Sequence, residues 1–526
     1  MLARCTTAAL QGLEAQPVTV EVDLGPGLPA LTLVGLADAA VLEARERVRS
    51  ALRHSGCRVP QGRVVVNLAP ADLRKEGPGF DLPVALGLLL ASGQLEPASL
   101  AGVWSAGELG LDGTLRPIRG MLSIALRARA CGARALLLPA ANGPEAALVE
   151  GLALWPASSL SDLLGRLAGG GGDWPAPAPP AAAQGRGEGA GGDLADIQGQ
   201  MLGRRALEIA AAGGHHLLLV GPPGSGKTML ARRLASLLPP LERSAALELT
   251  RIHSVAGLLP AAGQLLLQRP FRAPHHSCTG AALIGGGASP RPGELALAHH
   301  GVLFLDELAE FRPGVLDLLR QPLEEGEIRL QRARQRLRFP CAITLVAASN
   351  PCRCGWFGDP SRMCNCTEAE RRRYWGRLSG PLLDRIDLQV VMRRAEADEL
   401  AAPYVRADRV RAGRQEAGSG PEPEASATVA ERVARAHRRM ARRNPGGMGN
   451  ARLPVADLRR LAQPNGEALR FWRQVLAQRQ ISARGGEQLL RVARTICDLS
   501  GEHEITAEAV AEALLYRSMD RQSHQA

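Results

Sequence analysis

The sequence predicts an α/β protein organised around a glycine-rich phosphate-binding loop. The apolar run 217–220 is typical of a short buried strand, and residues 229–238 are typical of a helix that a Pro-Pro pair ends. A glycine-rich loop between a strand and a helix turns successive backbone N–H groups towards a bound phosphate. The loop consists of Gly221, Pro222, Pro223, Gly224, Ser225, Gly226, Lys227 and Thr228. We expect a nucleotide here; a bland glycine-rich turn is the alternative.

Two side chains of the loop have distinct expected roles. Lys227 should reach the terminal phosphates, and the Thr228 hydroxyl should ligate Mg²⁺. The chain has only two lysines, Lys75 and Lys227, and arginine carries nearly all other positive charge. A compact ammonium suits this position better than a wide guanidinium fork.

Length and composition bound the possibilities. A chain of 526 residues with 45% hydrophobic residues is globular and long enough for about three domains. The net charge is +11, whereas residues 1–168 contain fifteen basic and fifteen acidic side chains, so the excess follows residue 168. This asymmetry predicts contact with a polyanion; general arginine enrichment is the alternative.

The sequence also bears on location. No segment has the ~18 uninterrupted apolar residues of a membrane span, and the N-terminus lacks the apolar core of a signal peptide. We therefore expect a cytoplasmic protein that does not contact membranes. Its ten cysteines are then thiols or metal ligands rather than disulfides.

Residues 1–167 are predicted to form an α+β domain. Its expected strands and helices alternate along the chain: strand 18–23, helix 39–53, strand 63–68, helix 80–90 and strand 135–139. Residues 168–192 are rich in Gly, Pro and Ala, and predict a flexible linker.

The region 193–397 carries the predicted nucleotide chemistry. The apolar run 302–305 predicts a buried strand that ends in Asp306 and Glu307. Asp306 is expected to hold the Mg²⁺ shell, and Glu307 to orient and deprotonate the attacking water. A second strand, 341–350, ends in Asn350, which could hold that water near the γ-phosphate. The alternatives are a surface Asp-Glu pair and an ordinary turn asparagine.

Four cysteines follow Asn350 within fifteen positions: Cys352, Cys354, Cys364 and Cys366. The turn-rich residues between the two pairs can fold back, and four thiolates match a tetrahedral structural Zn²⁺ site. The Cys-x-Cys spacing is tighter than the usual gap of two to four residues, so unliganded thiols or a redox pair stay open as alternatives. The histidine pairs 275–276 and 299–300 favour ordinary loop positions over metal binding, because adjacent residues on a strand point apart.

Arginines recur at every second residue shortly before the predicted strand 341–350. They are Arg332, Arg334, Arg336 and Arg338. On one strand, that period would place all four on one face. Apolar residues flank them at 328, 330, 337 and 339, so we expect a hairpin whose tip lies near 332–334. The arginines would suit nucleic-acid phosphates and unpaired bases; a solvated basic edge strand is the alternative.

The C-terminal part begins after a second polar, Pro- and Gly-rich linker at 398–425. Residues 426–526 are predicted to be helical. Ser482 precedes a helix with an apolar face, and Thr506 is a plausible N-cap of the last helix.

Several stretches together resemble the ComM/YifB family of magnesium-chelatase-like AAA+ ATPases. They are 204–215 (RRALEIAAAGGH), 271–276 (FRAPHH), 290–294 (PRPGE) and 378–385 (LSGPLLDR). The resemblance implies an AAA+ P-loop ATPase core with a helical lid, which assembles as a homohexamer and uses ATP and Mg²⁺. It also implies a sensor role for Asn350, an arginine finger at Arg385 and a second sensor arginine at Arg484 that acts in cis. For Arg385, a surface salt bridge with Asp384 or Asp387 is the alternative.

For ComM-like members, the resemblance implies a DNA helicase that drives branch migration in natural transformation. The arginine hairpin would then line the central channel of the ring and contact single-stranded or branched DNA. The same core also serves chelatase subunits, so a chelatase-like or chaperone-like ATPase that remodels a protein client is the alternative function.

The first domain resembles the Lon-protease-like domain found in front of such ATPases. The stretches that carry this resemblance are 75–83 (KEGPGFDLP) and 107–113 (GELGLDG). Active members use a Ser–Lys pair, but Gly79 stands at the serine position, and residues 121–124 contain no lysine. Without a nucleophile and its base, acyl transfer has no mechanism, so we expect a degenerate domain without protease activity.

Overall fold

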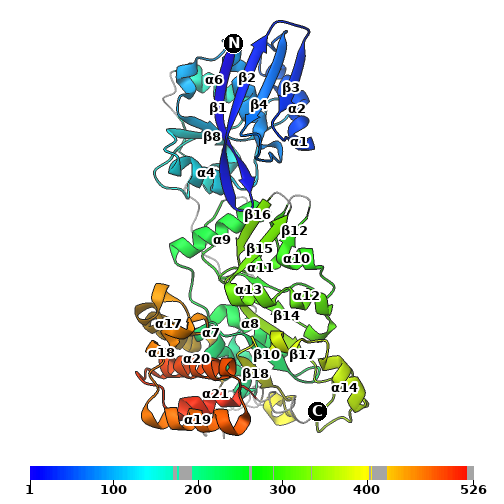
Figure 1. Ribbon diagram of the computed structural model, residues 1–526, viewed down its shortest axis with the longest axis vertical. Helices are drawn as coiled ribbons and strands as arrows, with labels where there is room; N and C mark the ends of the chain where they lie inside the picture. Colours follow the sequence, from blue (N-terminus) through cyan, green and yellow to red (C-terminus); the bar gives the residue numbers. More distant parts are fainter. Residues whose placement is uncertain are drawn as a thin grey trace.

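The computed structural model describes residues 1–169, 174–176, 192–259, 263–287, 290–332, 335–401, 404 and 423–517. Figure 1 shows three parts: an N-terminal domain (residues 1–169, blue to cyan) at one end of the long axis, a core (192–401, green to yellow) below it, and a lid (423–517, orange to red) beside the lower half of the core. Among the described helices, none has the length and apolar character needed to cross a membrane.

The N-terminal domain is built on a mixed seven-stranded sheet. The strand order is β3-β4-β2-β1-β5-β8-β9, in which the long β1 and β2 are antiparallel. The strands of this sheet are β1 (Leu2–Gln11), β2 (Glu14–Gly25), β3 (Ala30–Val34), β4 (Arg63–Ala69), β5 (Val103–Ser105), β8 (Ala135–Pro139) and β9 (Ala153–Ala157). A short pair, β6 (Glu108–Leu109) and β7 (Leu115–Arg116), lies outside it. The helices are α1 (Ala39–Leu42), α2 (Ala44–His54), α3 (Asp81–Ala91), α4 (Met121–Ala130), α5 (Gly143–Ala146) and α6 (Leu160–Ala168).

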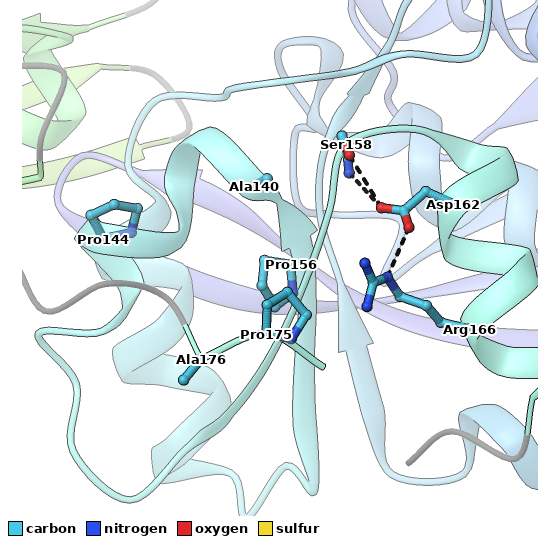
Figure 2. Close-up of a pocket in the computed structure, with 8 residues that line it drawn as sticks. All are labelled: Ala140, Pro144, Pro156, Ser158, Asp162, Arg166, Pro175 and Ala176. Atoms are coloured by element: carbon cyan, nitrogen blue, oxygen red, sulfur yellow. Dashed lines mark hydrogen bonds and ion pairs between the residues drawn. The ribbon is translucent and has the colours of Figure 1, made fainter. Parts of the chain in front are cut away.

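The end of the first domain differs from the predicted linker. Trp174 stacks on Trp155 with ring centroids 5.1 Å apart, and the Arg166 guanidinium lies 5.8 Å from the Trp174 ring. Residues 174–176 therefore belong to the surface of this domain. Figure 2 shows a cavity of about 220 Å³ beside them, where Asp162 accepts hydrogen bonds from Ser158 and Arg166. Residues 170–173 and 177–191 of the predicted linker lie outside the described residues.

The core contains a parallel five-stranded sheet in the order β11-β14-β17-β10-β18. Its strands are β11 (Phe271–Arg272), β14 (Val302–Leu305), β17 (Thr344–Ser349), β10 (Leu217–Val220) and β18 (Leu388–Val391). β10, β14 and β17 are wholly buried, as a sheet covered on both faces requires. The core helices are α7 (Met201–Gly213), α8 (Lys227–Leu237), α9 (Arg243–Ala256), α10 (Gly280–Ile284), α11 (Glu294–Leu297), α12 (Pro313–Asp317), α13 (Arg320–Glu325), α14 (Glu368–Trp375) and α15 (Gly380–Leu383).

The lid consists of α17 (Ser426–Arg443), α18 (Val455–Leu461), α19 (Gly466–Arg479), α20 (Ala483–Ser500) and α21 (Ala507–Leu515). The predicted caps are present, since Ser482 accepts from the Gly485 N–H and Thr506 accepts from the Ala509 N–H. The lid shares one apolar cluster with the core, in which α17 and α20 pack on α7. Most of the predicted second linker, 402–403 and 405–422, lies outside the described residues.

The predicted arginine hairpin is formed by β15 (Glu327–Arg332) and β16 (Gln335–Pro340), while a smaller hairpin joins β12 (Gly285–Gly286) to β13 (Arg291–Pro292). The prediction that all four arginines share a face was wrong. In the antiparallel register Arg332 pairs with Gln335 and Arg336 pairs with Gln331, so positions 332 and 336 alternate to opposite faces of the hairpin. Arg336 and Arg338 lie exposed on the other face, together with Arg329. Arg334 and the side chain of Arg332 lie outside the described residues.

The N-terminal domain docks on the core through the β1–β2 turn (Figure 1). Leu13 at this turn is 6% exposed and joins the apolar cluster that contains Ile328, Leu337 and Phe339 of the arginine hairpin. Its carbonyl accepts hydrogen bonds from Arg251 of α9, at 2.7 and 3.1 Å. The first domain therefore contacts the same hairpin that carries Arg336 and Arg338.

Candidate functional site

The glycine-rich loop joins β10 to α8, as the sequence predicts. Gly224 and Gly226 have φ values of 79° and 84°, which turn the loop around an open centre. Ser225 is buried, and its hydroxyl has no hydrogen-bond partner among the described residues. A buried donor without a partner, next to the N-terminus of an eleven-residue helix, suits a phosphate group.

Lys227 lies across this loop. Its Nζ donates to the carbonyls of Gly221 and Pro222 at 2.7 and 2.9 Å, and to Oδ1 of Asn350 at 3.2 Å. Burial lowers the pKa of Lys227 below its ordinary value. An anionic phosphate would be a better partner for this ammonium than neutral carbonyls are. The structure thus brings the predicted lysine and sensor asparagine together.

The two carboxylates follow β14, which lies two positions from β10 in the sheet. β14 lies beside β17, which lies beside β10, so their carboxyl ends meet at one edge of the sheet. The Thr228 hydroxyl donates to Oδ2 of Asp306 at 2.8 Å. A hydroxyl and a carboxylate in contact beside a phosphate site are the oxygen ligands that Mg²⁺ prefers.

Glu307 has a contact that sequence reasoning missed. Its Oε2 lies 3.2 Å from Nδ1 of His276, which follows β11 at the neighbouring position in the sheet. Glu307 adopts a left-handed conformation with φ of 52°, which turns its backbone sharply at the end of β14. Its side chain is 56% exposed, so water can reach the carboxylate.

The two predicted arginines of the site, Arg385 and Arg484, share one carboxylate. Arg385 Nη2 lies 2.5 Å from Oε2 of Glu324, and Arg484 Nη1 lies 3.3 Å from Oε1 of the same residue. Neither arginine contacts the phosphate loop within the described ranges. The structure thus places Arg484 beside Arg385. The partner of Arg385 is also Glu324 rather than Asp384 or Asp387.

Asp387 instead takes part in a buried contact between core and lid. His215 lies between it and Thr495 of α20, with Nδ1 3.0 Å from Asp387 Oδ2 and Nε2 2.8 Å from the Thr495 hydroxyl. Burial raises the pKa of Asp387, but the hydrogen bond with His215 together with the charges of His215, His216 and Arg491 more than offsets this, so the pKa lies below its usual value. The Thr495 hydroxyl also lies 3.0 Å from the Arg491 carbonyl, which fixes it within α20.

The four cysteines converge as predicted. Their sulfur atoms all lie within 4.8 Å of one another, with Cys352 Sγ 3.3 Å from Cys354 Sγ and 3.7 Å from Cys364 Sγ. The edges of a tetrahedral Zn–S₄ site with bonds of about 2.3 Å are about 3.8 Å long. The Cys366 N–H donates to Cys364 Sγ at 3.4 Å. This donor set fits Zn²⁺.

Comparisons with known proteins found matches to the N-terminal domain, the core and the lid. Three family descriptions match consecutive parts: "Subunit ChlI of Mg-chelatase" at residues 20–142, "Magnesium chelatase, subunit ChlI" at 193–400 and "Magnesium chelatase, subunit ChlI C-terminal" at 423–517. The YifB protein of Salmonella typhimurium is 42% identical over 521 residues, covering 99% of this chain and 98% of that protein. The competence protein ComM of Haemophilus influenzae is 41% identical over 527 residues, covering 99% and 98%.

The chain belongs to the ComM/YifB family of magnesium-chelatase-like proteins. The AAA+-like core of this family supports ATPase activity. The geometry at Lys227, Thr228, Asp306 and Asn350 agrees with that assignment.

Part of the chain is also similar to a protein outside the family. Lon protease 2 of Bacillus subtilis is 30% identical over 144 residues, which cover 26% of each chain. Within residues 1–169 no Ser–Lys pair forms: the Lys75 ammonium donates to the Pro70 carbonyl, and the Ser123 hydroxyl donates to the Leu13 carbonyl. Gly79, at the predicted nucleophile position, lies against Ile118, whose Cδ1 would be 3.1 Å from a Cβ.

The second histidine pair makes a cluster with Glu248. Nε2 of His299 and Nε2 of His300 lie 3.2 and 3.3 Å from its carboxylate. Nδ1 of His299 accepts the Ala342 N–H at 2.9 Å, so the ring proton of the neutral imidazole is on Nε2. In the neutral imidazole this proton faces the carboxylate of Glu248, and the ligand atoms of Glu248, His299 and His300 all lie within 4.8 Å of one another.

Proposed function

We propose that this protein is an ATP-hydrolysing, ring-forming motor that acts on DNA in the cytoplasm, as a helicase or branch-migration enzyme. One observation carries the ATPase part: Lys227, Thr228, Asp306, Glu307 and Asn350 meet at one edge of the core sheet. ATP with Mg²⁺ fits that edge, because the Ser225 hydroxyl lacks a partner and Thr228 contacts Asp306.

Each residue has a defined part in hydrolysis. The loop N–H groups and Lys227 bind the phosphates, and Thr228 and Asp306 hold Mg²⁺, which supplies charge neutralisation on the phosphate oxygens when bound. Glu307 orients the attacking water and accepts its proton. Asn350, which contacts Lys227 at 3.2 Å, is placed to hold that water near the terminal phosphate.

The test of this proposal separates nucleotide binding from turnover. Glu307→Gln should keep ATP affinity and lower turnover by ~10²–10⁴-fold, because the amide cannot accept the proton. Lys227→Ala should weaken binding itself. Glu310→Gln is a matched control, since this exposed carboxylate lies on the same turn and pairs with Arg377 at 3.1 Å. Hydrolysis by Glu307→Gln at the wild-type rate would refute the assignment of the base.

We propose a homohexamer in which Arg385 reaches the nucleotide of the adjacent subunit. Arg484 is proposed to act as a second sensor on the nucleotide of its own chain, and it lies beside Arg385 because both pair with Glu324. Mixing inactive Lys227→Ala subunits with inactive Arg385→Ala subunits should restore part of the ATPase activity. Some interfaces would then combine an intact loop with an intact arginine. No recovery in mixed rings of confirmed composition would place Arg385 on its own nucleotide.

For DNA, the proposal rests on Arg336 and Arg338. Both are exposed on one face of the hairpin, and neither has an ion-pair partner within the described residues. Arg332 and Arg334 stay part of the proposal as residues at the hairpin tip. Changing Arg336 and Arg338 together to Ala should leave basal ATPase activity intact, weaken binding of single-stranded DNA and flatten its salt dependence. Arg329→Ala is the control, since Arg329 is already paired with Glu327 at 2.5 Å.

Stimulation of the ATPase distinguishes the two function classes. Single-stranded or branched DNA should stimulate the motor. Stimulation by a protein or porphyrin partner alone would instead favour the chelatase-like or chaperone-like remodeller.

We also propose that Cys352, Cys354, Cys364 and Cys366 hold a structural Zn²⁺ ion. Metal analysis of purified protein should give near one zinc per chain. Four titratable free thiols without zinc in freshly prepared protein would contradict it.

A further inference from the structure

The cysteine segment, defined here as residues 351–366, lies directly against the phosphate loop. Gly355 within it is buried and has φ of +84°. A Cβ at this position would lie 2.8 Å from Cδ and 3.0 Å from Cγ of Pro223, and 3.9 Å from Cγ of Asn350. The backbone of Gly355 therefore packs on the proline ring at the centre of the loop, beside the sensor asparagine.

The two ends of the cysteine segment are fixed on α14. The Trp375 indole donates to the Pro351 carbonyl at 2.9 Å, and the Arg371 guanidinium donates to the Cys366 carbonyl at 2.8 Å. Thr367 caps the first turn of the helix. These contacts fix the positions of residues 351 and 366. The position of Gly355 depends on the residues between them.

Few contacts besides the cysteine cluster hold the middle of the segment. Its large apolar side chains do not form a core, since Phe357 is 43% and Met363 is 87% exposed. Two arginines from outside the segment lie over its rings, Arg371 at 4.4 Å from the Phe357 ring and Arg394 at 5.6 Å from the Trp356 ring. The Gly355 N–H donates to the carbonyl of Cys352 at 3.0 Å, which ties the glycine to the first cysteine pair. One ion bound by all four sulfur atoms would join the second cysteine pair to the first and close the segment.

We propose that Zn²⁺ bound by the four cysteines presses Gly355 against Pro223, and that zinc occupancy thereby sets the affinity of the phosphate loop for ATP. This inference rests on the proposed nucleotide site. Without the ion the segment loosens, and the loop loses the contact that holds Pro223 and the adjacent N–H groups in place. Nucleotide binding is affected more than the chemical step, because Glu307 is held separately, at the end of β14.

The first experiment uses the full-length protein and a fluorescent ATP analogue. Zinc is extracted with a chelator under reducing conditions and then restored, and the dissociation constant is measured at each stage together with zinc content. Extraction should raise the Kd by about ten- to hundredfold, as expected for losing one hydrogen bond to a charged group, and Zn²⁺ should restore it. Equal affinity of the zinc-free and zinc-loaded protein would overturn the proposal.

The second experiment leaves all four thiols in place. Gly355→Ala should retain zinc but bind the analogue more weakly, because the new Cβ collides with Pro223. Gly358→Ala is the matched control: it lies in the same segment with φ of +80°, and a Cβ there has no heavy atom within 4 Å. Thermal melting of both variants tests that they are folded. If Gly355→Ala binds nucleotide like Gly358→Ala, the contact with Pro223 does not set affinity. If zinc-loaded wild type itself binds no analogue, the proposed nucleotide site fails instead.

Discussion

Replacing Asp387 with Asn should loosen the joint between the core and the lid. Asp387 and Thr495 contact the buried His215 from both sides, at 3.0 and 2.8 Å, and Asp387 is the only charged group among its described hydrogen-bond partners. The asparagine keeps an acceptor oxygen but removes that charge. A hydrogen bond to a charged group contributes about 2 kcal/mol, so the free energy of unfolding should fall by about that amount. Asp387→Ala removes the acceptor as well and should cost ~3–5 kcal/mol, as for a broken buried pair.

Thermal and urea unfolding at pH 7 measure this loss. About 2 kcal/mol corresponds to a decrease of roughly 4–8 °C in the melting temperature of the core and lid. Because the pKa of folded Asp387 lies below its ordinary value, the pair contributes its stability above the unfolded pKa of 3.8 and loses it as the pH falls through the folded pKa. The difference between wild type and Asp387→Asn should therefore be constant near neutral pH and shrink only in strong acid.

Asp384→Asn provides the control for Asp387→Asn. Asp384 lies three positions earlier on the same turn but is exposed, so its substitution should change stability by no more than about 0.5 kcal/mol. If Asp387→Asn melts at the same temperature as Asp384→Asn and wild type, the buried contact does not join the lid to the core.

Three further predictions concern the first domain and the hairpin. Burial raises the pKa of Glu145 above its ordinary value of 4.5, although Ser254 of α9 and other donors hydrogen-bond to the carboxylate. The free energy of unfolding should therefore fall as the pH rises from 4.5 through the pKa of folded Glu145. Glu145→Gln should flatten this pH dependence in thermal melts between pH 4.5 and 8. Phe339→Ala should destabilise the core by ~3–5 kcal/mol in urea unfolding, because the Phe339 ring of β16 is fully buried in the apolar cluster beneath the hairpin. A loss below 1 kcal/mol would contradict this packing. Leu13→Ala should cost ~2–5 kcal/mol of domain docking, and calorimetry should then resolve separate transitions for the N-terminal domain and the core; a single unchanged transition would show that the β1–β2 turn does not couple them.

The sequence alone determined the features that depend on local order along the chain. A strand, a glycine-rich loop and a helix are contiguous, so the place of residues 221–228 between β10 and α8 could be predicted. The same holds for Asp306 and Glu307 at the end of an apolar strand, and for the caps Ser482 and Thr506. The cysteine cluster was predictable because all four thiols lie within fifteen positions. In each case, the partners are close in sequence, or the parallel sheet brings strand ends together by rule.

Only the tertiary structure decided which residues pair across long separations in sequence. His276 faces Glu307, Glu324 holds Arg385 and Arg484, and Leu13 packs beneath the arginine hairpin. No periodicity in the chain marks these contacts, because each joins elements whose mutual orientation is set by how the sheet, lid and first domain pack. The error over Arg332 has the same origin: an alternation of two holds along one strand, whereas Arg332 belongs to β15 and Arg336 to β16, whose pairing decides which face each position occupies. The contact of Gly355 with Pro223 also depends on the fold, because β17 must lie beside β10 before the segment after β17 can reach the phosphate loop.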